Sequence, residues 1–365
     1  MTSKTQSLDG VRALRRLELG PVEVRARGLT VPYVAVVGKR REQIELSYRY
    51  EEDVFDVDEP RSQNLAAMIG AQVALNYGLF CDELVFHGPF DRHDRRLLRD
   101  MAENTAREIA VKKLFQPNPF LVGPVRQLKP VKQDRYLRAE LLFAESEPGA
   151  TRGSPSGGWT GEHSRCAVLS SGGKDSLLTH GLLEEIGCES HPLFVNESGR
   201  HWHTALNAYR FFSDSVPNTA RVWTNADRVF SWMLRQLPFI RQDFAQVRAD
   251  EYPIRLWTVA VFAFGVLPLV RKRGIGRLLI GDEFDTSVRR THEGIPHYDG
   301  LYDQSRYFDR ALSQYFRRKG WSLSQLSVLR PLSELLIQKI LAERYPQLLA
   351  VQVSCHATHI EAERV

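Results

Sequence analysis

The stretch CAVLSSGGKDSLLTHGLLEEIG, residues 166–187, decides the fold. An apolar run from Cys166 to Ser170 leads directly into a turn with two glycines, and a helical pattern of leucines follows from Ser176 to Ile186. Glycines allow backbone conformations that other residues avoid, and they bring N–H groups close to an anion. The N-terminus of the following helix adds partial positive charge. This strand, turn and helix therefore predict a phosphate-binding loop.

Each residue of the turn has a chemical role that suits a nucleotide. Serine hydroxyls can donate hydrogen bonds to phosphate oxygens, and Lys174 can neutralise the charge that grows on a departing pyrophosphate. Asp175 can hold a Mg²⁺ ion that bridges the phosphates, or it can orient the loop by accepting N–H bonds. We predict Lys174 and Asp175 to be catalytic. The predicted nucleotide-binding residues of the loop are Ser171, Gly172, Gly173, Lys174, Asp175 and Ser176.

The hexapeptide SGGKDS, residues 171–176, resembles the SGGxDS signature of the PP-loop ATP pyrophosphatases. The resemblance covers the second half of the chain, from about Cys166 to Ile340. It implies the adenine nucleotide α-hydrolase fold, a parallel sheet of about five strands. It also implies that the chain converts ATP into AMP and pyrophosphate to activate a substrate, with Mg²⁺. The spacing that defines P-loop kinases, Gly-x-x-x-x-Gly-Lys-Ser/Thr, is absent.

Strands and helices continue to alternate after the loop. Strand patterns occur at residues 191–196, 219–224 and 277–281. Such alternation indicates an α/β protein, a parallel sheet with helices on both faces. Ligands of this architecture bind at the carboxyl ends of the strands.

A segment rich in Gly, Ser and Pro, residues 145–163, predicts a flexible linker. Before it, the pattern predicts strands at 31–37, 43–48 and 83–86 and helices at 63–77 and 92–113. We therefore predict an N-terminal α+β domain over residues 1–144, which could bind the substrate, and a PP-loop domain over residues 164–365.

Acidic residues follow the predicted strand of RLLIGDEFDT, residues 277–286. Asp282, Glu283 and Asp285 lie close together, and neighbouring carboxylates are costly without a cation. The resemblance implies an acidic residue near the metal at this place. We predict Asp175, Asp282 and Glu283 as Mg²⁺ ligands, with a solvated loop as the alternative.

The segment LRPLSELLIQKI, residues 329–340, resembles the Pro-Leu segment and helix that PP-loop proteins carry near the end of the nucleotide domain. The resemblance implies that Arg330 faces the phosphates. A salt-bridged arginine is the alternative interpretation.

The residues after the second strand, VNESGRHWHTALNAY at 195–209, are dense in groups that bind ligands or transfer protons. Histidine exchanges protons near neutral pH, and arginine grips a carboxylate with two parallel hydrogen bonds. We predict Glu197, His201 and His203 as catalytic residues, and Arg200 is a further candidate for contact with the substrate. Ordinary polar residues at a helix start are the alternative.

Two further groups could contact the substrate. Asp250, Glu251, Arg255 and Trp257 precede an apolar helix, where they could line the same cleft or form buried ion pairs. His292, His297 and the segment 298–306 have the composition of a substrate-binding loop.

The composition excludes few classes of ligand or partner. Lys plus Arg number 49 against 44 Asp plus Glu, a net charge of +5 that suits polyanionic ligands and leaves tRNA open. The apolar stretch 256–270 is too short to span a membrane. Four cysteines without zinc-ligand spacing fit a reducing cytoplasm, and Cys355, His356 and His359 alone are too few for a closed zinc site.

The order of the two predicted domains is similar to that of UDP-N-acetylmuramoyl-L-alanyl-L-glutamate epimerases, cell-wall (peptidoglycan) enzymes of the superfamily. That similarity implies adenylation of the terminal glutamate's carboxylate, followed by proton removal from Cα by His201, His203 or Glu197. The substrate would be a carboxylate-bearing small molecule or nucleotide-sugar. The alternatives are an amide- or nitrile-forming enzyme similar to 7-cyano-7-deazaguanine synthase, a tRNA-modifying PP-loop enzyme, or a non-enzymatic adenine-nucleotide sensor.

Overall fold

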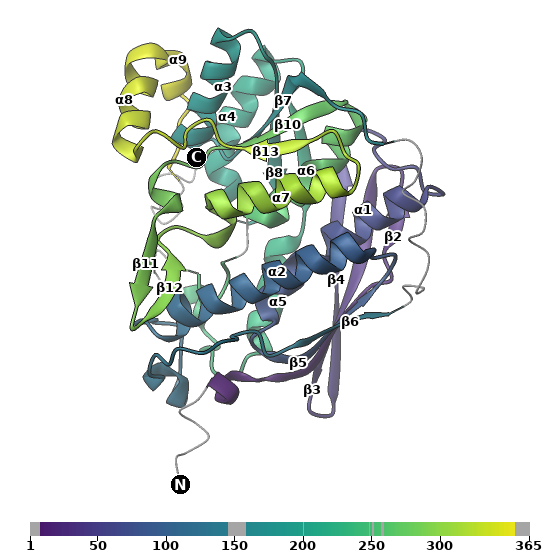
Figure 1. Ribbon diagram of the computed structural model, residues 1–365, viewed down its shortest axis with the longest axis vertical. Coiled ribbons are helices and arrows are strands. Elements are labelled where there is room, and N and C mark those ends of the chain that lie inside the picture. The colour runs from purple at the N-terminus through teal and green to yellow at the C-terminus, as the bar shows by residue number, and fades with distance from the viewer. Residues whose placement is uncertain are drawn as a thin grey trace.

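One long mixed sheet runs through the computed structural model, which describes residues 8–144, 158–199, 201–247, 249, 252–256 and 259–354 (Figure 1). Its strand order is β13 (Ser324–Leu326), β10 (Ile275–Ile280), β7 (Glu162–Ser170), β8 (Glu189–Asn196), β9 (Ala220–Thr224), β4 (Arg40–Tyr50), β3 (Gly28–Val37), β1 (Leu14–Leu19), β5 (Cys81–His87) and β6 (Glu140–Ala144). A short strand, β2 (Glu23–Arg25), pairs with β3 beside this path.

The strands at one end of this sheet are parallel to one another. β13, β10, β7, β8 and β9 pair in parallel throughout. β7 comes first in the chain and lies in the middle, with β8 and β9 on one side and β10 and β13 on the other. The direction of winding therefore reverses between β7 and β10, which opens a crevice at their carboxyl ends. This arrangement confirms the predicted α/β fold class.

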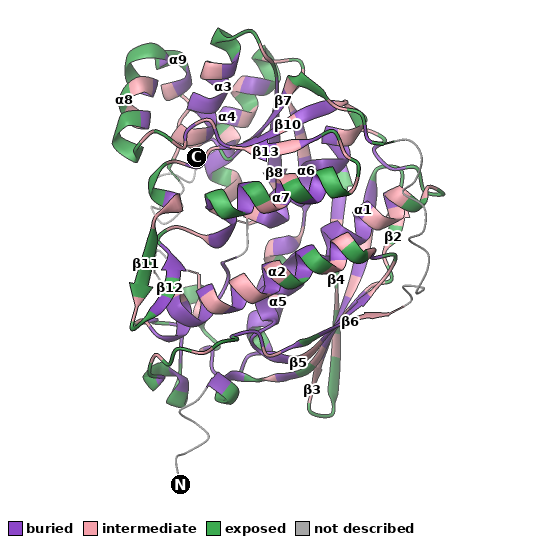
Figure 2. Ribbon diagram, in the orientation of Figure 1, coloured by how far each residue is buried: buried purple, intermediate pink, exposed green. Residues whose placement is uncertain are grey.

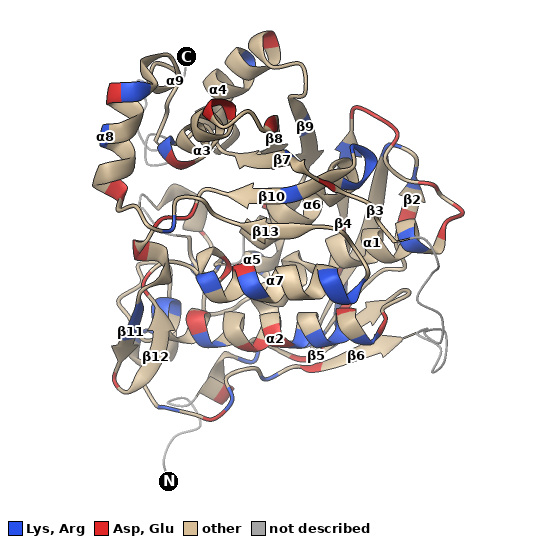
Figure 3. Cartoon of the chain, turned by 45° about the horizontal axis from the view of Figure 1, so that its top comes forward, with Lys and Arg blue, Asp and Glu red and all other residues tan. Residues whose placement is uncertain are grey.

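Helices cover both faces of the parallel part. On β8, Leu193 packs in one apolar cluster and the next residue, Phe194, in another, because successive strand residues point to opposite faces. The Phe194 face carries α3 (Lys174–Glu185), α4 (His201–Ser215), α8 (Glu334–Arg344) and α9 (Pro346–Leu349). The Leu193 face carries α5 (Ala226–Arg235), α6 (Val259–Lys272) and α7 (Arg306–Arg318). In Figure 3, α3 and α4 lie above β7 and α7 lies below β13.

The apolar stretch 256–270 largely forms α6, a buried helix of the core (Figure 2). Gly265 of this helix lies so close to Tyr48 that an added Cβ would come within 3.0 Å of the ring. Among the described residues, no helix combines the length and apolar character needed to cross a membrane.

The N-terminal strands extend the same sheet. β1, β3 and β4 are antiparallel, whereas β5 and β6 run parallel to β1. Covering helices are α1 (Pro60–Ala71), the 3₁₀ helix η3 (Val73–Tyr77), α2 (Arg92–Ile109) and its π-helical continuation η4 (Ala110–Leu114). Asp91 and Asp94 form a capping box that fixes the start of α2.

β4 joins the two halves of the chain, because it pairs antiparallel with β9 between Tyr48 and Thr224. One apolar core also contains residues of both halves. The division into two domains stays a prediction, and residues 145–157 of the predicted linker lie outside the described residues. In the described part, the halves share a sheet and a core.

A separate hairpin of β11 (Arg289–His292) and β12 (Ile295–Tyr298) follows β10. The backbone N–H of Tyr298 donates to the buried carboxylate of Glu108 on α2, at 3.3 Å. Lys112 of η4 donates to the carbonyl oxygens of Asp299 and Gly300. These contacts fix the hairpin against the end of α2.

Candidate nucleotide and acceptor site

The turn between β7 and α3 requires glycine at its second position. Gly172 has φ +76°, a left-handed conformation that side chains disfavour, and an added Cβ would approach the carbonyl oxygen of Thr204 to 3.0 Å. The turn therefore packs directly on the backbone of α4. Of the residues that the structure describes, an added Cβ at Gly173 would meet only the Ser171 hydroxyl, at 3.5 Å, so they leave this side of the turn open to a ligand.

The polar groups of the turn suit an anion. Gly173 is the N-cap of α3 and offers no side chain, so N–H groups of the first helical turn are available to phosphate oxygens. Ser171 is exposed. Ser176 is buried, and its hydroxyl donates to the Gly173 carbonyl at 3.1 Å, so it would have to turn to reach a phosphate. These residues fit the phosphates of ATP.

Lys174 and Asp175 form an ion pair beside the turn. The Lys174 Nζ lies 2.9 Å from both carboxylate oxygens of Asp175. Burial lowers the pKa of Lys174, but the hydrogen bond to Asp175 and the negative charges of Asp175, Glu283 and Glu334 together outweigh burial, so the net pKa is raised. Burial raises the pKa of Asp175 despite this partner. Lys174 is therefore a half-buried cation held at the mouth of the phosphate loop.

The predicted acidic cluster lies against the start of α3. An added Cβ on Gly281 would come within 2.7 Å of Asp175 Cβ, so glycine lets the end of β10 approach the loop. Burial, and then the neighbouring Asp175, raise the pKa of Glu283. A divalent cation would relieve the repulsion between these two carboxylates, although Lys174 already binds both oxygens of Asp175. The assignment of Asp175 and Glu283 to Mg²⁺ stays a prediction.

Asp282 has a different environment. It is 1% exposed, and burial raises its pKa well above the ordinary range. Arg330 lies 3.3 Å from one carboxylate oxygen, while the other, Oδ1, has no hydrogen-bond partner in the described ranges. Among the described residues, no three His, Cys, Asp or Glu side chains converge as a metal-binding group. The assignment of Asp282 to the metal stays a prediction.

Arg330 is bound on all sides by protein. Its guanidinium pairs with Asp309 at 2.7 Å and with Asp282, and it donates to the carbonyl oxygen of Gln304 at 2.7 Å and to Thr286 Oγ1 at 2.9 Å. The side chain is 13% exposed. The structure thus shows the salt-bridged alternative for Arg330, in a largely buried form, and its contact with phosphate stays a prediction.

Replacing Arg330 by Met is expected to lower the free energy of unfolding by about 3 kcal/mol, because two buried carboxylates lose their cation. Urea unfolding measures this. The matched control is Arg344→Met, which breaks an exposed pair with Glu185 and should cost less than about 1 kcal/mol. Equal effects of the two substitutions would contradict a structural role for Arg330.

A second polar cluster, here called the Glu197 cluster, lies where β8 and β9 end. It comprises Glu197, Asp227, Tyr252 and Arg255. Arg255 donates to Asp227 at 2.8 Å, and its guanidinium carbon stands 3.9 Å from the centre of the Tyr252 ring. Glu197 is 3% exposed, and its Oε1 has no hydrogen-bond partner within the described part of the chain. Burial raises the pKa of Glu197 to about 7, although Arg255 acts in the opposite direction.

The other residues predicted in this region do not all lie at the Glu197 cluster. His201 begins α4, and its ring centre lies 5.6 Å from that of Tyr252, so it adjoins the Glu197 cluster. His203 is exposed. Arg200, Asp250, Glu251 and Trp257 lie outside the described residues, as do Cys355, His356 and His359. The catalytic roles of Glu197, His201 and His203 stay predictions.

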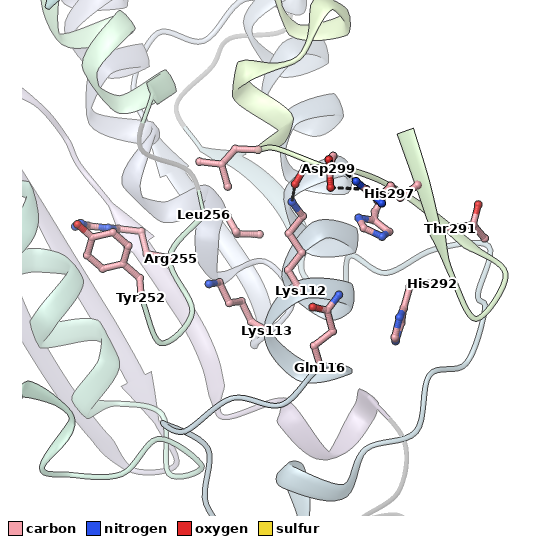
Figure 4. Close-up of a pocket in the computed structure, with 12 residues that line it drawn as sticks. Lys112, Lys113, Gln116, Tyr252, Arg255, Leu256, Thr291, His292, His297 and Asp299 are labelled. Atoms are coloured by element: carbon pink, nitrogen blue, oxygen red, sulfur yellow. Dashed lines mark hydrogen bonds and ion pairs between the residues drawn. The ribbon is translucent and has the colours of Figure 1, made fainter. Parts of the chain in front are cut away.

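A cavity of about 670 Å³ adjoins the Glu197 cluster (Figure 4). Tyr252 and Arg255 form one wall, and the β11–β12 hairpin with His292 and His297 forms the other. Lys112 and Lys113 of η4 lie between the two walls. Both histidines of the predicted substrate loop thus line one cavity. Burial lowers the pKa of His297, whose Nδ1 lies 2.9 Å from the Tyr298 carbonyl oxygen.

Several residues of the site were not singled out from the sequence. Lys112, Lys113 and Arg290 line the cavity, and Asp227 holds Arg255. Asp227 could have been predicted from the sequence, because it comes shortly after the third parallel strand of the chain, just as Asp282 comes shortly after the fourth. The lysines had no such signal, because they end a helix far from the other lining residues in the sequence, and only the fold brings them to the cavity.

The fold defines an α/β protein with a glycine-containing turn at the switch point of a parallel sheet, a turn whose groups suit an anion. No protein-family model matches the chain. The chain is 38% identical over 63 residues to a 7-cyano-7-deazaguanine synthase from Chlorobium phaeobacteroides, a stretch that covers 17% of this chain and 28% of that protein. This partial similarity supports the PP-loop superfamily and ATP-dependent enzymes at that coarse level, and lends no support to the epimerase resemblance in particular.

Proposed function

We propose that this protein is an AMP-forming ATP pyrophosphatase that activates a carboxylate. The observation that carries the proposal is the open turn at Gly173, flanked by the half-buried Lys174 cation, at the carboxyl end of β7. A phosphate chain placed there meets backbone N–H donors and a cation together.

The chemistry follows from these groups. An oxygen of the acceptor carboxylate attacks the α-phosphorus of ATP, the bond from that phosphorus to the bridging oxygen breaks, and pyrophosphate leaves with an acyl adenylate remaining. Negative charge grows on the departing pyrophosphate, and Lys174 is placed to stabilise it. Mg²⁺, held by Asp175 and Glu283, would supply further charge neutralisation.

Two finer assignments remain proposals. Epimerisation of the terminal glutamate of UDP-N-acetylmuramoyl-L-alanyl-L-glutamate needs a proton-transferring residue near the adenylate, and the buried Glu197 is a candidate. The synthase-like alternative is favoured by the partial similarity to 7-cyano-7-deazaguanine synthase. Both share the same activation step.

Incubation with ATP, Mg²⁺ and a panel of carboxylate acceptors tests the activation step. We expect AMP and pyrophosphate to form together, dependent on one acceptor. The panel includes the UDP-muramoyl dipeptide and 7-carboxy-7-deazaguanine. Formation of ADP would contradict the proposal, and tight ATP binding without turnover on any acceptor would favour a nucleotide sensor.

A further inference from the structure

We propose that the outer faces of α2 and α7 form a docking surface for a nucleic-acid duplex, which they hold through its phosphates. Exposed arginines of both helices make up this surface, here called the arginine surface. Its members are Arg92, Arg96 and Arg99 of α2 and Arg310, Arg317 and Arg318 of α7. None of them belongs to the phosphate loop or lines the cavity, so the surface stands apart from the proposed activation of a carboxylate.

α2 and α7 pack side by side and run in opposite directions. Tyr307, near the start of α7, donates to Asp100 in the middle of α2 at 2.8 Å. Lys319, directly after α7, donates to Asp91 at the N-cap of α2. The arginines at the end of α7 therefore lie beside those at the start of α2. Figure 3 shows the two helices one above the other, with basic residues on both.

The arginine surface has no carboxylates of its own that pair with it. Among the described residues, none of its arginines forms an ion pair with a carboxylate. The acidic side chains of the two helices have other partners, in the pairs Asp91–Lys319, Asp94–Lys319, Asp100–Tyr307, Glu103–Arg135, Glu108–Arg107 and Asp309–Arg330. Asp94 and Glu108 are also fully buried. The exposed charge of the two helices is therefore predominantly positive, which suits a polyanion.

The start of α2 is an unfavourable place for so many cations. Arg92, Arg95, Arg96 and Arg99 all lie in the first half of this helix. A helix N-terminus carries partial positive charge, and arginines four positions apart repel one another. Arg95 and Arg99 also stand over the same ring, Phe143, at 5.4 and 5.7 Å, so their guanidinium groups are close together. A bound polyanion would relieve this repulsion.

The composition of the surface favours a nucleic-acid duplex over other polyanions. Every exposed cation on the two helices is an arginine, whose planar fork matches phosphate oxygens. Tyr307, at 41%, is the one large apolar side chain exposed on α2 or α7, both of which are fully described. A protein interface needs an apolar centre, a membrane-bound helix needs an apolar face, and a single strand needs aromatic platforms for its bases. The phosphates of a duplex can be held by charge alone, without entry into a groove.

Fluorescence anisotropy with a labelled DNA duplex of about 20 base pairs tests the proposal. The affinity is measured between about 50 and 200 mM salt. We expect the logarithm of the binding constant to fall with the logarithm of the salt concentration, with a slope of about −4 or steeper. Each phosphate that the protein neutralises contributes about −0.9 to this slope.

Paired substitutions locate the contact on both helices. Arg96→Gln together with Arg99→Gln, on α2, should weaken duplex binding about tenfold and make the salt slope shallower by about two, since each lost phosphate contact removes about one. Arg317→Gln together with Arg318→Gln, on α7, should have the same two effects. A change of slope distinguishes lost phosphate contacts from a merely structural effect of the substitutions.

A matched control removes the same charge elsewhere. Arg15 of β1 and Arg126 of the 3₁₀ helix η5 (Gly123–Gln127) are exposed and lie outside both helices. Arg15→Gln together with Arg126→Gln should change the affinity less than about twofold and leave the slope unchanged. All variants should keep the circular dichroism spectrum of the wild type. None of these measurements requires ATP turnover, so their failure is distinct from failure of the proposed function.

Competitors identify the kind of partner. Unlabelled duplexes of DNA and of RNA should both displace the probe, because both present a phosphate backbone, whereas a single strand should compete less well. Polyglutamate and vesicles of phosphatidylserine should not displace it. Displacement by polyglutamate as strong as by the duplex would overturn the assignment to nucleic acid. Absence of duplex binding at the lowest salt, or an equal loss in the control variant, would overturn the arginine surface as a docking site.

Discussion

Replacing Lys174 by Met is expected to lower kcat/KM for acceptor-dependent pyrophosphate release about a thousandfold, or about 4 kcal/mol of transition-state stabilisation. The Lys174 ammonium is half-buried beside the open turn and is held there by Asp175. Charge accumulates on pyrophosphate only as it leaves, so the cation acts more strongly on the transition state than on bound ATP. The affinity for a non-hydrolysable ATP analogue should therefore fall much less than the rate.

The control for this prediction is Lys339→Met. Lys339 is exposed on α8 and forms a surface pair with Glu343. Its loss should leave both the rate and the affinity within about twofold, since exposed pairs contribute little. A Lys174→Met protein that keeps more than a tenth of wild-type activity would show that another group neutralises the leaving pyrophosphate.

The sequence predicted the parallel half of the fold because its signals are local. The apolar run of β7, the glycines at 172 and 173 and the leucines of α3 lie within 22 consecutive residues. The structure confirms this strand, turn and helix. The pairing of β4 with β9 could not be predicted in the same way. It joins Tyr48 to Thr224 across 176 positions, and its register depends on the shared core rather than on either strand alone.

The residues of the candidate site also differ in whether a local sequence signal could predict them. Glu197 and the acidic residues after β10 were predictable because they directly follow strands, whose carboxyl ends meet in a parallel sheet. The partners of Arg330 were not, since Asp309 lies on α7 and Gln304 precedes it, and neither carries a motif. An arginine in a Pro-Leu segment looks the same in sequence whether it faces phosphate or two buried carboxylates.

Glu197→Gln is expected to have the second large effect, a loss of about a hundredfold in kcat/KM if Glu197 transfers a proton. Burial raises the pKa of this carboxyl from 4.5 to about 7, near neutral pH where proton transfer is efficient. Acting as a base, it must be ionised, so wild-type kcat/KM should rise with pH and level off above about 7. In the variant this limb of the pH profile should disappear.

Stability provides an independent measurement of the same group. A carboxyl whose pKa is raised by folding binds a proton more tightly in the folded state, so stability is full below its unfolded value of 4.5 and declines as pH rises to about 7. Asp175, Asp282 and Glu283 also have raised pKa values, so Glu197→Gln should remove only the part of the decline that ends near pH 7. Glu189→Gln, at the exposed start of β8, should preserve that part. If Glu197→Gln removes that part of the decline but leaves the pH profile of kcat/KM intact, Glu197 is a buried structural carboxyl. If Glu197→Gln removes both that part of the stability decline and the rising limb of the kcat/KM profile, Glu197 transfers the proton. Only a group that reacts in its ionised form makes the rate follow its own titration.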